Sequence, residues 1–412
     1  MAHGSRGLRR VLVWGGWSLV LLVGLSALFI ASSNRSYARA IREFESWVGP
    51  ADLARYVGEP IPAEQNTAIA VPLAAKDVVL DAGWALAPEP AAWSAAEAEE
   101  ARNALAREQP TIEAVERALA LSGCRWPAVQ AEVTAWSIPM LASSRLLRLM
   151  GFVGVLDGDR SQIQRSFRDL GELADCVYTQ PGLAGSLVAS AVSRARLEVA
   201  RAALASPSTG PELLDWLATE LESSFEVDRI AWALGSEGAF ALHFVQNPQL
   251  AGADPQSGGF YSIFSRRVAT DLADRWVELS AWSEEPLETL LSKPRREAQS
   301  GVAVTGVIAD IMLPNLRDAV VKLRTLRELT GIALTAIEVR GRGLEHGNYD
   351  GPLTARHDLE TIREADGSVM ILDPKLERLL RQHYAPAGPE PYRGIEATLQ
   401  LTVWRLPAAG GR

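Results

Sequence analysis

An uncharged apolar run extends from Val11 to Ala31, close to the N-terminus of the 412-residue chain. A helix of that length spans about 31 Å, which matches the hydrocarbon core of a bilayer. Trp14 and Trp17 lie near the start of the run, where aromatic side chains favour the membrane–water interface. A helix that is apolar on all sides needs a core around it, and too little chain precedes this one to supply it. The run therefore predicts a membrane-spanning helix.

Two interpretations of this leader remain open. The small residues at 31–33 are compatible with a signal-peptide cleavage site. Against cleavage, the apolar stretch is longer than the roughly 7–15 residues that signal peptides use. The length favours an uncleaved anchor, and a cleaved signal peptide is the alternative.

Charge predicts the orientation of the anchor. Arg6, Arg9 and Arg10 precede the apolar run, and no acidic residue accompanies them. Because basic flanks stay on the cytoplasmic side, residues 1–10 are expected in the cytoplasm, residues 11–31 in the membrane and the remainder outside. Later apolar stretches such as Gly301–Leu313 look too short for a second span. The expectation is a single-pass protein.

Composition and net charge indicate which classes of partner the chain could bind. Apolar residues make up 48% of the chain, enough for a packed core. The net charge is −9, and because residues 1–10 contribute +3, the rest carries −12. That excess argues against nucleic acid or an anionic lipid surface as the main partner. Basic residues are almost all arginine, which we interpret as the bias of a GC-rich bacterial genome. The predicted location is thus the bacterial inner membrane, with the large domain in the periplasm.

The exported part, residues 34–340, has the pattern of a mainly α protein. Its clearest block runs from Pro139 to Ala205, where apolar residues recur at helical spacing. Asp157-Gly158-Asp159 separates the first two helices, with Asp159 as an N-cap, and Pro181-Gly182 separates the second from the third. Three successive helices fit either a helical bundle or an irregular array of helical hairpins. The sequence has no repeat of fixed period and no linker that would divide it. The number of helical domains, one or two, therefore stays open.

The rest of this region also has helical patterns. The expected helices cover residues 34–48, 66–86, 92–109, a segment capped by Thr111, and residues 212–223, 226–246, 261–282, 285–296 and 313–338. After Gly341 the pattern changes. Residues 368–373 and 396–404 are rich in apolar and β-branched side chains and are separated by Gly and Pro. We expect residues 341–412 to form a small α/β segment whose β element packs on the long helix.

Cys124 and Cys176 are the two cysteines, and both fall in the exported part. In an oxidising compartment they could form a disulfide. The alternative is two separate buried thiols that pack as small apolar groups. No histidine lies near either one in sequence, so an activated thiol is the weakest interpretation.

Residues 325–353 resemble a pseudopilin-like module. The match includes Gly343-Leu344-Glu345-His346-Gly347-Asn348-Tyr349, followed by residues 350–353. In that module a long helix ends in a similar stretch, and a leucine and a β element follow. The stretch in that module starts with an aromatic residue and ends with a proline. Here that proline is displaced and that aromatic residue is absent. The cleavage glycine and the early glutamate of true pilins are also absent, so the resemblance implies an accessory component without pilin processing. The 139–205 block is similar to uncharacterised membrane-anchored helical proteins of environmental bacteria.

No common catalytic motif occurs, and no cofactor or metal site is expected. The zinc helix, the phosphate-binding loop and the nucleophile elbow have no match. Three histidines fall near acidic residues in the C-terminal region, but their spacing fits no known ligand set: His346, His357 and His383. Asp157 and Asp159 fit a turn and cap better than a calcium loop. The 12 tryptophans fit core packing better than a glycan groove.

These observations favour a membrane-anchored periplasmic protein that binds other envelope proteins as an accessory component. Its partners would be the inner membrane, through residues 11–31, and proteins of the envelope. One alternative is a hydrolase of envelope polymers, which needs two carboxylates facing each other across a cleft at about 5–10 Å. Another is an accessory pseudopilin-like component of a secretion machine. No residue is identified as catalytic, and the enzyme question stays open.

Overall fold

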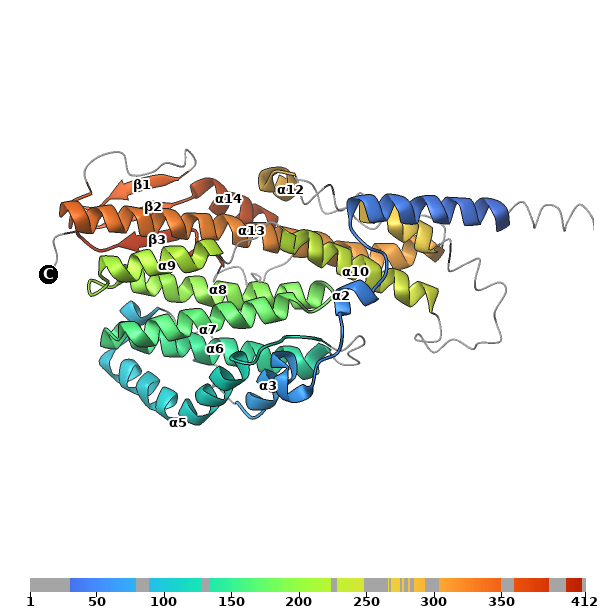
Figure 1. Cartoon of the computed structure of the whole chain (residues 1–412). Helices are drawn as coiled ribbons and strands as arrows, with labels where there is room; N and C mark the ends of the chain where they lie inside the picture. The colour runs from blue at the N-terminus through green and yellow to red at the C-terminus, as the bar shows by residue number, and fades with distance from the viewer. Residues whose placement is uncertain are drawn as a thin grey trace, which may run out of the picture.

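The computed structural model describes most of the chain after residue 29. The described residues are 30–78, 89–126, 133–223, 228–247, 266, 268–274, 276–277, 281, 285–292, 304–349, 359–384 and 398–409. Arg6, Arg9, Arg10 and nearly all of the predicted 11–31 helix lie outside them. Within them the protein is mainly helical with one small sheet, as the sequence predicts (Figure 1).

The described chain opens with a helix over residues 30–47, which follows directly on the apolar run. Ala40, Phe44 and Val48 are buried at helical spacing. Their face meets α10 (Asp228–Gln246), where an added Cβ at Gly238 would lie 2.6 Å from the Phe44 ring. The segment next to the predicted anchor is therefore part of the folded core.

Short elements connect this helix to the next long one. They are α2 (Ala54–Val57), η1 (Ala63–Gln65), α3 (Thr67–Ala74) and η2 (Pro90–Ala92). The helix expected over residues 66–86 ends at Ala74 among the described residues. Asn66 caps α3, because its side chain accepts a hydrogen bond from the Ala68 N–H at 3.1 Å.

The next helix, α5 (Ala95–Leu119), corrects an expected break. The sequence predicts one helix ending at Gln109 and another capped by Thr111, but α5 runs through Pro110. Proline removes one backbone hydrogen bond and bends a helix without always ending it, and Figure 1 shows α5 bent. The cap is Ser94, which forms a capping box with Glu97.

The centre of the protein is formed by three consecutive helices, α6 (Val133–Asp157), α7 (Arg160–Tyr178) and α8 (Leu183–Ala205). They pack on one another, and α5 covers α6. Gly151 permits their close approach, because a Cβ there would lie 2.6 Å from the Ser166 hydroxyl and 2.8 Å from the Val199 methyl groups. The apolar stripe of α7 is confirmed as core, since its members are all buried: Ile163, Phe167, Leu170, Ala174 and Val177.

The turn between α6 and α7 confirms the structural interpretation of its aspartates. Asp159 caps α7 by accepting the Gln162 N–H at 3.0 Å. Gly158 has a φ of +65°, which favours glycine. Asp157 pairs with Arg102 at 2.8 Å. The two acidic side chains therefore stabilise the turn and its contact with α5.

Helix α6 differs from expectation in its length and apolar content. It begins at Val133, before Pro139, and its segment Ala135–Asp157 is long and apolar enough to cross a membrane by length and composition. The expectation that no later stretch is long enough is therefore wrong. The most apolar window is 67% buried inside the protein, as in the core helix of a packed domain.

The longest helix, α13 (Val304–His346), has 43 residues and extends beyond the expected 313–338 at both ends. It packs against α8 and α9 (Pro211–Ser223). Gly341 and Gly343 lie inside it, so the predicted boundary between residues 340 and 341 falls within a helix. Packing explains the continuation, because the Tyr349 ring lies against Gly343 where a Cβ would be only 2.2 Å away.

A small antiparallel sheet follows, in the order β1 (Glu360–Arg363), β2 (Val369–Leu372) and β3 (Val403–Leu406). Ile371 pairs with Thr361 on one side and with Trp404 on the other. Both β2 and β3 contact α13, and β3 also contacts α8. Helix α14 (Pro374–His383), capped by Asp373, connects β2 to the following chain and contacts α12 (Leu287–Ser292). The sequence pattern anticipates β2. The expected stretch 396–404 overlaps β3 only at Val403 and Trp404, because residues 398–400 are helical, and β1 is not anticipated.

Candidate functional site

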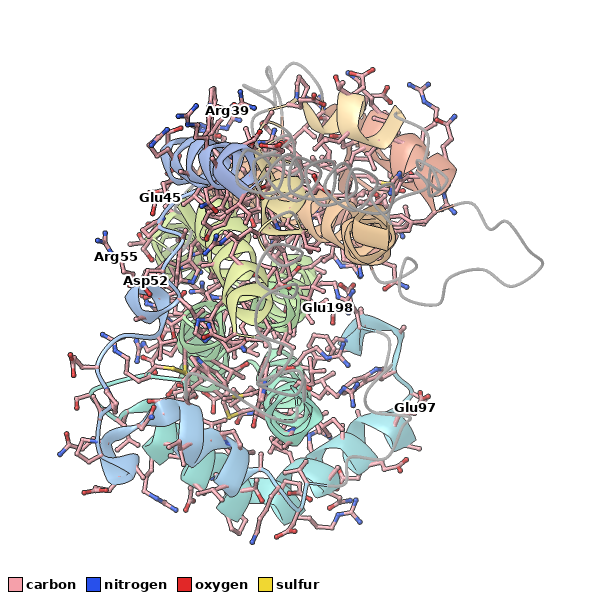
Figure 2. All side chains as sticks on the ribbon, turned by 90° about the vertical axis from the view of Figure 1, so that its right-hand side faces the viewer. Arg39, Glu45, Asp52, Arg55, Glu97 and Glu198 are labelled. Atoms are coloured by element: carbon pink, nitrogen blue, oxygen red, sulfur yellow. A yellow bond between two sulfur atoms is a disulfide. The ribbon has the colours of Figure 1, made fainter. Side chains whose placement is uncertain are left out.

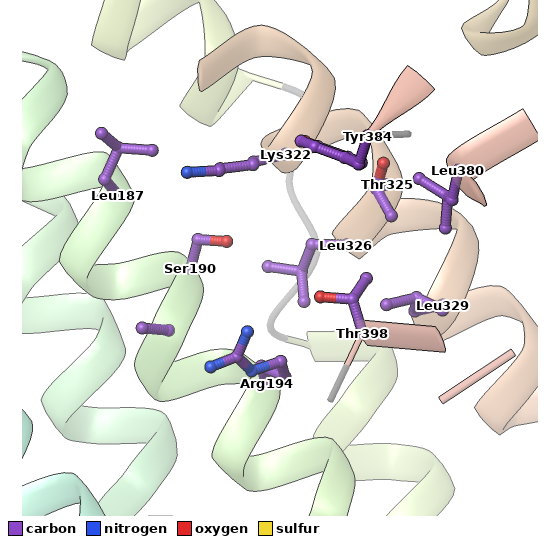
Figure 3. Close-up of a pocket in the computed structure, with 11 residues that line it drawn as sticks. Leu187, Ser190, Arg194, Lys322, Thr325, Leu326, Leu329, Leu380, Tyr384 and Thr398 are labelled. Carbon is purple, nitrogen blue, oxygen red and sulfur yellow. The ribbon is translucent and has the colours of Figure 1, made fainter. Parts of the chain in front are cut away.

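A cavity of about 170 Å³ lies between α8, α13 and α14. Figure 3 shows side chains from all three elements around it. It is lined by Leu187, Ser190, Ala191 and Arg194 of α8; Lys322, Thr325, Leu326 and Leu329 of α13; and Leu380, Tyr384 and Thr398 of the C-terminal segment. Residues far apart in sequence meet here because the C-terminal segment folds back over the groove between two packed helices.

Two cationic side chains reach the cavity. The Arg194 Nε lies 3.7 Å from Glu198 Oε1, beyond hydrogen-bond distance, and the same carboxylate also pairs with Arg148. One carboxylate is thus shared by two guanidinium groups. Lys322 extends from α13 toward α8 (Figure 3) and has no carboxylate within ion-pair distance among the residues that the structure describes. The cavity wall therefore carries an excess of positive charge.

The hydroxyl of Thr325 is the second unusual feature of the wall. The residue is 3% exposed, and its Oγ1 has no hydrogen-bond partner among the residues that the structure describes. Two other threonines of α13 satisfy theirs within the helix, since Thr330 donates to the Leu326 carbonyl and Thr335 to the Gly331 carbonyl, both at 3.0 Å. A buried polar group without a partner costs free energy. Thr325 is thus a buried hydroxyl that lines the cavity with its hydrogen-bonding capacity unused.

One side of the cavity is apolar and packed, although Ser190, Tyr384 and Thr398 also line it. Leu326, Leu329 and Leu380 are at most 4% exposed. The described lining residues include no acidic side chain. An apolar surface beside the Lys322 ammonium, an arginine that shares its carboxylate and a buried hydroxyl suits a small anion that has an apolar body.

A second, wider hollow of about 720 Å³ lies between α8 and the C-terminal sheet. Three of its carboxylates pair with arginines: Glu89 with Arg201, Glu364 with Arg405 and Glu377 with Arg381. Burial raises the pKa of Glu89, although its contact with Arg201 opposes that shift. Hydrogen bonds from Ser368 lower the pKa of Asp366. A carboxylate that is paired with an arginine is ionised and occupied by that pair. The described groups of this hollow therefore do not provide the free acid and base of a glycosidase.

Two exposed aliphatic side chains mark another surface. Leu73 on α3 is 63% exposed, and Ile138 on α6 is 64% exposed. The two helices pack against each other. Trp47, at the end of the 30–47 helix, is 61% exposed. Most other large apolar side chains of the described chain are buried, so these positions are distinct from the rest of the surface.

The structure separates the residues that the sequence singles out. His346 is exposed at the end of α13, and His383 lies against the Tyr384 ring at 4.8 Å between centroids. His357 falls outside the described residues. Among the described residues, no group of three or more His, Cys, Asp or Glu side chains could hold a metal ion. Four tryptophans are core residues: Trp126, Trp136, Trp276 and Trp404.

Cys124 and Cys176 form a disulfide, with their Cα atoms 5.5 Å apart. It joins the segment after α5 to the C-terminal part of α7. Trp126 lies beside it and donates its indole N–H to the Cys176 carbonyl at 3.1 Å. Neither cysteine lies on an element that lines the cavity.

Sequence analysis did not identify the cavity residues. The only sequence signal is local: Thr325 lies inside the apolar stripe of α13, between Leu323 and Leu326. Its α8 counterparts, Ser190 and Arg194, are more than a hundred residues away. Only the folded arrangement shows that these side chains share a wall.

Comparison with known protein families, curated proteins and solved structures finds no match to this chain.

Proposed function

We propose that this chain is a single-pass protein of the bacterial inner membrane whose periplasmic helical domain binds other envelope proteins as an accessory component. The observation that carries the proposal is the exposure of Leu73 and Ile138 on two helices that pack together. Exposed aliphatic groups on neighbouring elements favour contact with another apolar surface. A partner with an apolar contact face fits this end of the domain.

The 30–47 helix supports a fixed position for that surface. It begins, among the described residues, at the C-terminal end of the predicted anchor segment in sequence, and it buries Phe44 against α10. In Figure 2 it lies along one side of the bundle, with Arg39 and Glu45 on its outer surface. A membrane helix that continues into this element would hold the domain close to the bilayer, where membrane-bound partners are concentrated.

The test compares partner capture by matched variants. Full-length protein with a C-terminal tag is crosslinked in living cells, purified from membranes and analysed by mass spectrometry. The double variant Leu73→Asp/Ile138→Asp keeps its fold, because both side chains are exposed, and loses envelope proteins that the wild type captures. Asp215→Lys, an exposed change on α9, retains them. Equal capture by all three proteins refutes the role of this surface.

The anchor is tested by topology. Alkaline phosphatase fused to the C-terminus is active only outside the cytoplasm, so the wild-type fusion is active and stays with membranes. Replacing Arg6, Arg9 and Arg10 by glutamine weakens the charge bias and lowers the exported fraction. An intact mass that matches a chain starting at Met1 supports the anchor. A mass that matches a chain starting near residue 32 supports a cleaved signal peptide.

Two other functions are alternatives. The described glutamates of the wide hollow are paired with arginines, so the envelope-polymer hydrolase would be established only by hydrolysis of purified peptidoglycan that Glu89→Gln abolishes. The packing of the sheet on α13 favours the pseudopilin-like accessory role. Copurification with secretion components that depends on residues 325–353 would support that role over the general one.

A further inference from the structure

We propose that the cavity between α8, α13 and α14 is a binding site for a small monocarboxylate with an apolar body. The site is separate from the exposed surface of Leu73 and Ile138, so it goes beyond the proposed partner-binding function. Its main polar groups are the ammonium of Lys322, the guanidinium of Arg194 and the hydroxyl of Thr325.

The charge of the wall selects an anion. Glu198 is shared between Arg148 and Arg194, and Lys322 has no acidic partner within the described chain. A carboxylate between Lys322 and Arg194 would gain charge-assisted hydrogen bonds from both sides. The side chain of Arg194 is 34% exposed, so its guanidinium is partly in contact with solvent. An anion that contacts this guanidinium has its charge close to water.

Thr325 adds an observation that is independent of charge. Its buried Oγ1 lacks the i−4 carbonyl bond that Thr330 and Thr335 both make on the same helix. A ligand oxygen in the cavity would supply the missing partner. Native proteins pair most buried hydroxyls, and an exception in a cavity wall indicates a group that is satisfied when the site is filled.

Size and apolar lining define the body of the ligand. The cavity of about 170 Å³ is close to one of roughly 150 Å³ that is known to accept benzene. Leu326, Leu329 and Leu380 form its packed side. A single aromatic ring or a short branched chain fills this space. Inorganic phosphate would leave the leucines uncovered, which is why we assign the site to an apolar carboxylate.

Calorimetry on the full-length protein in lipid nanodiscs tests the assignment. The probes are phenylacetate, its neutral analogue phenylacetamide, hexanoate and inorganic phosphate. We expect saturable binding of phenylacetate or hexanoate, and weaker binding of phenylacetamide. Absence of saturable carboxylate binding, equal affinity for the amide, or tighter binding of phosphate overturns the proposal.

Paired variants locate the binding. Lys322→Met keeps most of the side-chain volume and lowers carboxylate affinity about tenfold or more, because a charge-assisted contact is lost. Its effect on phenylacetamide is small. The matched control is Lys375→Met, which removes a lysine of α14 that pairs with Glu288 at 2.5 Å outside the cavity. Indistinguishable carboxylate affinities for the two lysine variants overturn the site.

Thr325→Val gives a second, independent test, which can be carried out even if Lys322→Met does not fold. The hydroxyl has no partner in the unliganded protein, so its replacement by a methyl group leaves the melting temperature unchanged or raises it. The same change weakens phenylacetate binding. The control, Thr330→Val, removes a satisfied hydroxyl and lowers the melting temperature without changing affinity. Unchanged phenylacetate affinity in Thr325→Val contradicts the proposal.

Discussion

At the scale of single residues, Asp169 on α7 is a buried carboxyl with a raised pKa. Burial raises its pKa to about 7, and Glu116 and Glu172 add to the shift while Arg165 and Arg168 oppose it. Its Oδ2 is buried without a hydrogen-bond partner, as is Oε1 of Glu116 across the contact with α5. The Asp169 carboxyl is therefore protonated at a higher pH than it would be in water.

This position predicts a pH-dependent effect of Asp169→Asn. Because the folded pKa lies above the unfolded value near 3.8, the contribution of Asp169 to stability is fully present below that unfolded pKa and is lost as pH rises to about 7. The loss is at most about 4 kcal/mol. Asparagine does not ionise, so the variant should be more stable than wild type at pH 8 by about 1–3 kcal/mol and similar to it at pH 4. Urea unfolding at both pH values measures the difference, and an equal difference at the two values contradicts the account.

Individual residues show where sequence reasoning succeeds and fails. The capping role of Asp159 follows from its position before a periodic stretch, and the structure confirms it. Thr111 has the same local signal but lies inside α5, because the packing of Ile112 and Val115 continues the helix past Pro110. Thr325 gives no signal of its own, since an unsatisfied hydroxyl is a property of its surroundings.

At the scale of elements, the apolar stripes identify helices well when the partner is another helix. The stripes of α7 and α8 predict both helices, because each repeats a buried face over several turns. Strand β1 is missed for the opposite reason: it is an edge strand, and only Ile362 of its residues Glu360–Arg363 is apolar. Its place depends on pairing with β2. The continuation of α13 through Gly341 and Gly343 likewise depends on tertiary packing, which outweighs low helix propensity.

The disulfide makes an element-scale prediction. Cys124 and Cys176 close a loop with a sequence separation of 52 between the end of α5 and α7. In the chain-entropy description, such a link stabilises the fold by about 4 kcal/mol. The double variant Cys124→Ala/Cys176→Ala should therefore unfold at lower urea concentration, with its midpoint insensitive to reductant. The wild-type midpoint should fall when reductant is added. Identical midpoints for oxidised and reduced wild type refute this role.

At the scale of the whole molecule, the chain combines a predicted anchor with a mainly helical body. Figure 1 shows the 30–47 helix and the C-terminal sheet toward opposite ends of this body. Hydropathy and charge predict the anchor and its orientation because both depend on composition alone. The mainly α class also follows from pattern. Contacts between distant segments decide which surfaces are exposed and which polar side chains meet in a cavity. These features can be identified only from the structure.

We propose that the end of the domain formed by α3 and α6 contacts other envelope proteins. The most direct test places a photo-crosslinking amino acid at Ile138 in the full-length protein in living cells, with the same group at Asp215 on α9 as control. Our account predicts light-dependent adducts of defined mass from position 138 and none of those adducts from position 215. Crosslinks from both positions to the same proteins, or no adduct from position 138, would contradict it.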